Sequence, residues 1–237
     1  MPAIHLFGGE KGGVGKSFVC RTAIAYHLKH DIDFAAFDSD RSNPDVMRIY
    51  GSLIGCEAAV FSEGEKYEDT ANAVFNAAME KRVLVNLPAQ SLIPLKGWIE
   101  QNELFDLADE NDVQFVSWFV SDCGYDSLKL LGQSLDYFAD RARHVFVANY
   151  GMTEDWDSLK KDKALMARLR GDHVKVLKFP KFVGNVDRNQ IDARCLTFEA
   201  AAEHDEFGAI ARQRVKSFLR KAFEQFDAVG VFDAGKE

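Results

Sequence analysis

The sequence has little of what several classes of protein require. Its four cysteines, Cys20, Cys56, Cys123 and Cys195, lie far apart and form no CxxC pair, which argues against a zinc or dithiol redox site. Its six histidines show no HExxH or similar ligand spacing. No run approaches the roughly 20 apolar residues that cross a bilayer, and no basic segment with an apolar run opens the chain. We therefore expect reduced thiols, no membrane partner and a cytoplasmic protein.

Positive charge is also scarce. The 29 Lys and Arg residues face 37 Asp and Glu residues, for a net charge of −8. This balance opposes a general attraction to nucleic acid or anionic lipid, so such a contact has to be a local patch. The chain contains only five prolines and no Pro/Gly-rich linker, whereas 47% of its residues are hydrophobic. We expect one globular domain over residues 1–237.

Short β-rich runs alternate with longer helical patterns along the chain. The alternation predicts βαβ units and a mostly parallel sheet. Several runs are apolar at nearly every position, as in strands that helices cover on both faces. The predicted fold class is therefore α/β, with a doubly wound, mostly parallel central sheet and helices on both faces. The predicted strands are 3–7, 33–37, 58–61, 83–87, 113–120, 144–149 and 174–179, and the predicted helices are 16–29, 68–81, 92–110, 125–141, 156–170 and 205–226.

A glycine-rich loop joins the first predicted strand to the first predicted helix. The stretch GGEKGGVGKS (8–17) follows AIHLF and precedes SFVCRTAIAYHLKH. Glycines let backbone N–H groups surround phosphate oxygens, and the start of the helix adds the positive end of its dipole. Lys16 would reach the β- and γ-phosphates, and the Ser17 hydroxyl would bind Mg²⁺. The alternative is a glycine-rich turn without a ligand, but strand, loop and helix in this register favour a phosphate-binding loop.

The loop departs from the strict GxxxxGK[ST] pattern because Glu10 stands where its first glycine would be. The stretch KGGVGKS (11–17) resembles the deviant Walker A motif of the MinD/ParA family. The resemblance implies a P-loop NTPase fold, ATP and Mg²⁺ as cofactors, and a dimer formed around ATP. In that dimer Lys11 would contact phosphates bound by the other protomer, as arginine fingers do; the alternative is a solvated loop lysine. The implied nucleotide-binding residues of the loop are Gly12, Gly13, Val14, Gly15, Lys16, Ser17 and Phe18.

Two aspartates follow the second predicted strand, in FDSDRSNP (37–44). The carboxyl ends of parallel strands are where doubly wound sheets bind ligands. By resemblance to the family, Asp38 helps to position the attacking water and Asp40 meets the hydration shell of Mg²⁺. The alternative is that both residues cap a turn leading to Pro44.

Two further strand ends carry amides. VLVNLPAQ (83–90) resembles a second switch that usually ends in Asp-x-Pro-Ala-Gly, but Asn86 replaces the aspartate and Gln90 the glycine. An amide supplies no negative charge, so we expect weaker metal binding or slower turnover than in relatives. Asn149 lies where family members hydrogen-bond the adenine base; the alternative is a turn residue. No guanine-reading NKxD segment is present, which favours ATP over GTP.

Two segments carry clustered basic charge. The face between residues 160 and 181 can contact DNA phosphates, as in some ParA relatives, or can be a solvated helix face. The segment 212–226 is amphipathic, and we expect it to pack on the sheet instead of on a membrane.

Together these features predict a MinD/ParA-type ATPase. It would dimerise around Mg-ATP, with Lys11, Lys16 and Asp38 in catalysis. Through a protein partner or cargo adaptor it would position or segregate cargo, as in plasmid partition or conjugative mobilisation. One alternative, motivated by Asn86, is a nucleotide-gated binding module with little or no hydrolysis. Another is a small-molecule kinase or amidoligase that acts as a monomer.

Overall fold

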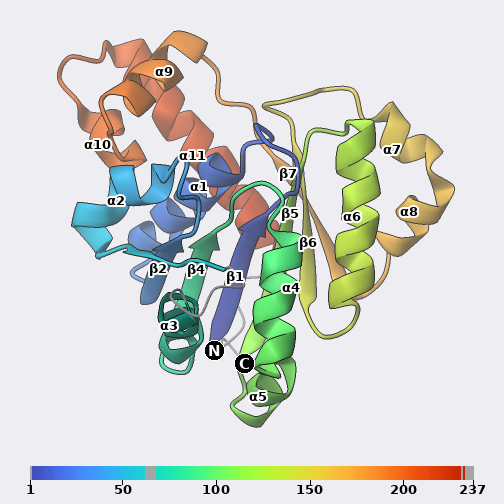
Figure 1. Ribbon diagram of the computed structural model, residues 1–237. Helices are drawn as coiled ribbons and strands as arrows, with labels where there is room; N and C mark the ends of the chain where they lie inside the picture. Colours follow the sequence, from blue (N-terminus) through green and yellow to red (C-terminus); the bar gives the residue numbers. More distant parts are fainter. Residues whose placement is uncertain (1, 62–67, 231, 233–237) are drawn as a thin grey trace.

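A parallel sheet forms the centre of the computed structural model, which describes residues 2–61, 68–230 and 232 (Figure 1). The described residues form seven strands in the order β3-β2-β4-β1-β5-β6-β7, and every neighbouring pair is parallel. The predicted α/β sheet is therefore confirmed. The strands are β1 (Ala3–Gly8), β2 (Phe34–Asp38), β3 (Glu57–Ala58), β4 (Arg82–Asn86), β5 (Gln114–Ser121), β6 (Arg143–Asn149) and β7 (Val174–Phe179).

Helices cover both faces of this sheet, which confirms the doubly wound arrangement. Buried side chains of α1, α2, α9, α10 and α11 share one core with one face, and those of α3 to α8 pack against the other. The helices are α1 (Lys16–Lys29), α2 (Asp45–Ile54), α3 (Glu68–Ala78), α4 (Leu92–Gln101), α5 (Leu104–Glu110), α6 (Tyr125–Phe138), α7 (Asp157–Lys161), α8 (Lys163–Arg168), α9 (Asn185–Ala193), α10 (Phe198–Glu203) and α11 (Ala209–Val229).

The strand order determines where a ligand can bind. The chain leaves β1 through α1 to reach β2 on one side, and later continues through β5 and β6 on the other side. Loops after parallel strands diverge at such a reversal and leave a crevice at the carboxyl ends of the strands. The loops that follow β1, β2, β4 and β6 all begin at this edge of the sheet.

Several predicted boundaries are wrong for local reasons. The predicted helix 92–110 is two helices, because Glu103 adopts a left-handed φ of 49° between them. The predicted helix 156–170 also breaks, where the Asp162 side chain accepts a hydrogen bond from Leu165 N (2.9 Å) and caps α8. The predicted strand 58–61 is reduced to Glu57–Ala58, and α2, α9 and α10 were not predicted.

The long helix α11 belongs to the core, as the amphipathic pattern predicts. Val215, Phe218, Ala222 and Phe226 are buried against the sheet and its neighbouring helices. The ring of Phe218 lies 5.3 Å from that of Phe18, which belongs to the first turn of α1. The apolar face of α11 is therefore covered by protein. No helix in the described part of the chain is long and apolar enough to cross a membrane.

Replacing Phe218 with alanine should destabilise the whole fold. The side chain is only 2% exposed, and truncating a buried phenylalanine costs roughly 3–5 kcal/mol. Urea unfolding should show this loss for Phe218→Ala and a change below about 0.5 kcal/mol for Ile210→Ala, whose side chain is exposed on the same helix. Equal effects would contradict a core role for α11.

Candidate functional site

The glycine-rich loop after β1 has the backbone geometry of an anion cradle. Gly13 and Gly15 have φ angles of 77° and 98°, which side-chain-bearing residues rarely adopt. A Cβ on Gly15 would lie 2.5 Å from Asn149 Nδ2, so glycine is the residue that fits. No side chain caps the start of α1 at Gly15. The first N–H groups of the helix therefore remain available to an anion at its positive end.

Lys16 is the buried cation of this loop. Its side chain is largely enclosed, and its Nζ donates a hydrogen bond to Lys11 O at 3.1 Å. Burial lowers the pKa of the Lys16 ammonium below its ordinary 10.5, against the opposing charges of Asp40 and Glu10. An anion bound beside this ammonium would restore part of the solvation that burial removes.

The loop opens into a cleft of about 570 Å³. This volume lies within the range of about 300–1,000 Å³ that is typical of sites for small molecules and cofactors. The cleft collects residues from the loops after β1, β2, β4 and β6 and from α9. Among the predicted site residues, it is lined by Gly12, Gly13, Gly15, Lys16, Ser17, Phe18 and Asp40.

Ser17 and Asp40, the predicted metal residues, both line this cleft. Mg²⁺ usually binds one or two protein oxygens and completes its shell with phosphates and waters. The described residues contain no cluster of three or more His, Cys, Asp or Glu that could hold a metal alone. A hydroxyl and a carboxylate in a cleft large enough for a cofactor fit Mg²⁺ that arrives with a nucleotide. Asp40 Oδ1 itself accepts from Ser42 N at 3.1 Å and from Asn43 N at 3.1 Å.

Asp38, predicted to position the attacking water, accepts hydrogen bonds from its own chain. Its side chain is buried and does not line the cleft. Oδ2 accepts hydrogen bonds from Val46 N (2.9 Å) and Met47 N (3.0 Å) at the start of α2. Oδ1 accepts from Asp40 N (3.1 Å) and Asn86 Nδ2 (2.8 Å). The contact between Asp38 and an attacking water stays a prediction, whereas these four hydrogen bonds are present.

The contact with Asn86 explains why an amide at this position is compatible with the fold. Burial raises the pKa of the Asp38 carboxyl above its ordinary 3.8, and the hydrogen bond from Asn86 leads the opposing effects. An aspartate in place of Asn86 would bring a second negative charge within hydrogen-bonding distance of the Asp38 carboxylate. Such a pair is unfavourable unless a proton or a metal ion lies between the two groups. Asn86 instead donates to Asp38, and its backbone oxygen accepts from Ser39 N at 2.9 Å.

Asn149, predicted to contact adenine, forms a hydrogen bond with the backbone of the glycine-rich loop. Its Nδ2 donates to Val14 O (2.8 Å), and its Oδ1 accepts from Gly151 N (2.9 Å). Asn149 and Val14 are both buried and do not line the cleft. The contact with the base stays a prediction, whereas the contact with the loop is present.

Sequence reasoning missed the wall of the cleft opposite the loop. Arg21 of α1 donates to Asp192 Oδ1 of α9 at 2.8 Å, and its guanidinium lies 5.0 Å from the Phe198 ring centroid. Arg21, Arg188 and Asp192 all line the cleft. No local pattern indicates this pairing, because the two helices lie far apart in the sequence.

Lys11 is paired within its own chain. Its Nζ lies 2.7 Å from Asp122 Oδ2, while Asp122 Oδ1 accepts from Gly124 N at 3.0 Å. The hydrogen bond that Lys11 donates to Asp122 raises the pKa of Lys11. Burial opposes ionisation of Asp122, but the bonds from Lys11 and Gly124 lower its pKa below the ordinary 3.8. Lys11 does not line the cleft, and its predicted contact with a second protomer stays a prediction.

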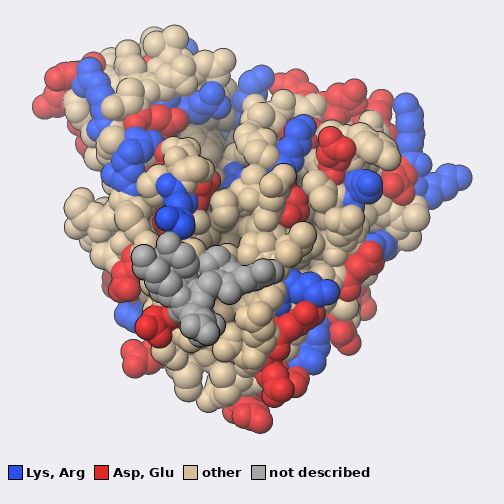
Figure 2. Space-filling view, in the orientation of Figure 1, with Lys and Arg blue, Asp and Glu red and all other residues tan. Residues whose placement is uncertain are grey.

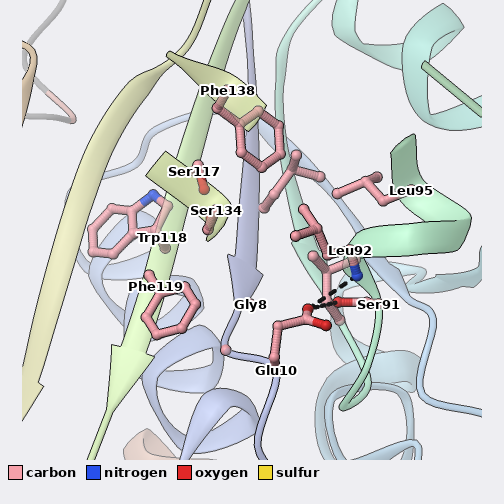
Figure 3. Close-up of a pocket in the computed structure, with 13 residues that line it drawn as sticks. Gly8, Glu10, Ser91, Leu92, Leu95, Ser117, Trp118, Phe119, Ser134 and Phe138 are labelled. Carbon is pink, nitrogen blue, oxygen red and sulfur yellow. Dashed lines mark hydrogen bonds between the residues drawn. The ribbon is translucent and has the colours of Figure 1, made fainter. Parts of the chain in front are cut away.

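Glu10, the residue that breaks the strict motif, connects the loop to α4. Its carboxylate accepts from Leu92 N (3.0 Å) and Ser91 Oγ (3.3 Å), as Figure 3 shows. Its backbone oxygen accepts from Gln90 N at 3.0 Å. Burial raises the pKa of the Glu10 carboxyl above its ordinary 4.5, against these hydrogen bonds. Glu10 therefore fixes the phosphate loop to the segment that resembles the second switch.

The sheet order and the loop after β1 together define the fold of MinD-like P-loop nucleotide-binding proteins. Two solved structures share it. MinD in the MinC:MinD cell division complex of Aquifex aeolicus is 12% identical, with 93% of this chain and 95% of that chain covered and a TM-score of 0.52. A nucleotide-binding protein of Archaeoglobus fulgidus, in complex with ADP, is 13% identical, with 81% and 86% covered and a TM-score of 0.53.

No protein-family model matches the chain. Among curated proteins, it is similar to the protein MobD of Acidithiobacillus ferrooxidans, with 28% identity over 143 residues. The match covers 60% of this chain and 62% of MobD, which is less than two thirds of either. The solved structures therefore show the fold, and MobD is a distant relative in sequence.

Replacing Asp38 and Asp40 with alanine should affect two different properties, stability for Asp38 and the effect of Mg²⁺ on nucleotide binding for Asp40. Asp38→Ala leaves buried N–H groups of α2 without an acceptor, so its free energy of unfolding should fall by at least about 2 kcal/mol. Asp40→Ala should change it by less than about 1 kcal/mol, because Asp40 bonds only to its own loop.

Urea unfolding and titration with a fluorescent ATP analogue would measure both properties. Asp40→Ala should weaken the effect of Mg²⁺ on nucleotide binding at nearly wild-type stability. A stable Asp38→Ala protein that has lost only this effect would contradict the assignment.

Proposed function

We propose that this protein binds Mg-ATP in the cleft beside the glycine-rich loop and hydrolyses it. The observation that carries the proposal is the enclosed Lys16 ammonium at an uncapped helix start, inside a cleft of about 570 Å³. Lys16 and the first N–H groups of α1 hold the β- and γ-phosphates. Ser17 and Asp40, which line the same cleft, would hold the metal. Bound magnesium neutralises charge on the phosphate oxygens.

We assign the two aspartates different roles in this activity. Asp40 lines the cleft and would orient water around the metal, whereas Asp38 would act as a positioning residue. Asp38 holds the start of α2 and the backbone of Asp40, so it sets the path of the segment that carries Asp40. Catalysis in this class depends mainly on positioning and electrostatic stabilisation, to which both residues contribute.

We further propose that two copies associate around ATP, with Lys11 reaching the phosphates of the other protomer. Lys11 is exposed at the start of the loop, where a cation can complete a neighbouring site. Two large apolar side chains are exposed next to residues that hold this part of the molecule together: Ile93 follows Leu92, which donates to Glu10, and Tyr125 follows Gly124, which donates to Asp122. The side chains of Ile93 and Tyr125 are 76% and 80% exposed. An association face that combines a cation with apolar side chains suits a reversible dimer.

Sedimentation velocity tests the nucleotide-dependent dimer. The 26.6 kDa chain should be a monomer with ADP and a dimer with a non-hydrolysable ATP analogue. Lys11→Ala should keep nucleotide affinity but remain monomeric. Lys16→Ala should lose at least about tenfold in affinity, because a charge-assisted hydrogen bond contributes about 1.5–3 kcal/mol. Lys29→Ala, an exposed lysine of α1, serves as the control.

A wild-type protein that stays monomeric with the analogue at saturating concentration would overturn the dimer. This outcome would not contradict nucleotide binding, which the affinity measurements test separately. Hydrolysis by that monomer would favour the small-molecule kinase or amidoligase alternative.

For the cellular role, we propose that the ATPase cycle serves the mobilisation of DNA through a protein partner. The name of the relative MobD supports this direction, since 28% identity links 60% of the chain to it. The cargo adaptor would then recognise the ATP-bound dimer and release the ADP-bound monomer.

The second candidate, a nucleotide-gated binding module, is favoured by Asn86. Its amide supplies no charge and is already engaged with Asp38. Single-turnover hydrolysis separates the two functions. For an ATPase, the wild-type rate should exceed that of Lys11→Ala by roughly 10³ or more, the lower range of arginine-finger effects. Rates in both proteins that are no faster than ATP hydrolysis without protein, with ATP bound in both, would leave the binding module.

A further inference from the structure

A second cavity lies at the β7 end of the sheet, between β6, β7 and the short helices α7 and α8. Its volume is about 190 Å³. Its floor and walls are apolar and include Phe146, Trp156, Leu159 and Leu169, which are all buried. It shares no lining residue with the cleft beside the glycine-rich loop. The proposed ATPase activity therefore does not use it.

The rim of this cavity is positively charged. Lys160, Arg170 and Lys178 line it together with Val176, whose side chain is 46% exposed on the edge strand β7. Lys160 pairs with Asp157 at 3.0 Å. Within residues 2–61, 68–230 and 232, Arg170 and Lys178 form no ion pair. Two cations beside an apolar opening are thus available to carboxylates from outside the chain.

The surrounding segment has the same sign of charge. Residues 154–181 contain eight Lys and Arg against five Asp and Glu, in a chain whose net charge is −8. Figure 2 shows Lys and Arg side chains projecting from the edge of the molecule where α7 and α8 lie in Figure 1. This edge can therefore attract acidic partners although the chain as a whole is negatively charged.

The size of the cavity limits what fills it. Sites for whole cofactors or drug-sized ligands are typically about 300–1,000 Å³, so about 190 Å³ suits one large apolar side chain. Interfaces between proteins concentrate their binding energy in such anchors, surrounded by polar contacts at the rim. We propose that this cavity is the docking site for an acidic segment of another protein, which inserts one large apolar side chain and pairs with Arg170 and Lys178.

The same observations disfavour DNA as the occupant. A phosphate backbone offers no apolar group to fill a cavity lined by Phe146 and Trp156. Several cations of the basic run are also neutralised within the chain: Arg168 lies 2.7 Å from Asp136, and Lys181 lies 3.1 Å from Glu154. Arg170 and Lys178 are the members of the run that line the cavity and form no ion pair among the described residues.

A random peptide library displayed on phage tests this proposal, with the full-length protein as bait and Val176→Glu as the counter-selection. Enriched peptides should combine Asp and Glu with one invariant large apolar residue. A synthetic peptide of the best sequence should then be measured by fluorescence polarisation at about 0.15 M salt. Replacing its apolar residue with alanine should weaken binding by roughly tenfold or more.

Matched charge reversals on one strand give the control. Lys178→Glu and Val176→Glu alter the rim of the cavity, and each should weaken the peptide by roughly tenfold. Lys175→Glu makes the same charge change as Lys178→Glu on the same exposed strand, but Lys175 does not line the cavity. Lys175→Glu should change the affinity for the peptide by less than about twofold, because an exposed charge outside the contact is largely screened.

The proposal stands apart from the ATPase. Lys16→Ala should bind the peptide as tightly as the wild type, so failure of nucleotide binding leaves this result unaffected. The absence of enrichment over the counter-selection would overturn the docking site, as would equal losses in Lys175→Glu and Lys178→Glu. Binding of duplex DNA that Lys178→Glu abolishes, without any peptide binding, would assign the surface to nucleic acid instead.

Discussion

The phosphate loop can keep its shape only because other parts of the chain hold it at both ends. At its start, the Glu10 carboxylate accepts from Leu92 N at the beginning of α4. Near its end, the Asn149 amide donates to Val14 O and lies so close to Gly15 that a Cβ there would clash. A loop of this conformation is costly to order by itself, so preorganisation by β4 and β6 precedes ligand binding. The nucleotide cleft is thus a property of the whole sheet edge.

The Asp38 carboxylate has a comparable role on the other side of the cleft. It joins three elements at once: the end of β2, the start of α2 and Asn86 at the end of β4. Because four donors share one carboxylate, movement of the second-switch segment at Asn86 is coupled to the position of α2 and to the backbone of Asp40. The two segments that resemble switches therefore share one carboxylate, and in the proposed function a change at the phosphates would reach α2 through it.

The sequence predicts the parts of this architecture that local patterns determine. Alternation of apolar runs and helical periods indicated the parallel sheet, and the loop motif indicated the helix start at Lys16. The helix α2 escaped prediction because Asp38 caps it from outside the helix, before Pro44. The cleft wall at Arg21 and Asp192 depends on packing between distant helices. α10 carried a readable signal, since Thr197 caps it through Ala200 N. Asp122 offered none, because only the tertiary fold brings it to Lys11.

The pairing of Lys11 with Asp122 bears on how quickly the protein can respond to a neighbour. Exposed ion pairs contribute little net free energy, and dissolved salt weakens them further. Breaking the ion pair between Lys11 and Asp122 therefore costs little free energy. While it is formed, the pair keeps the Lys11 ammonium at one position at the start of the loop. In the proposed dimer, Asp122 would hold Lys11 at the start of the loop until a phosphate replaces the carboxylate, and this exchange would depend on ionic strength.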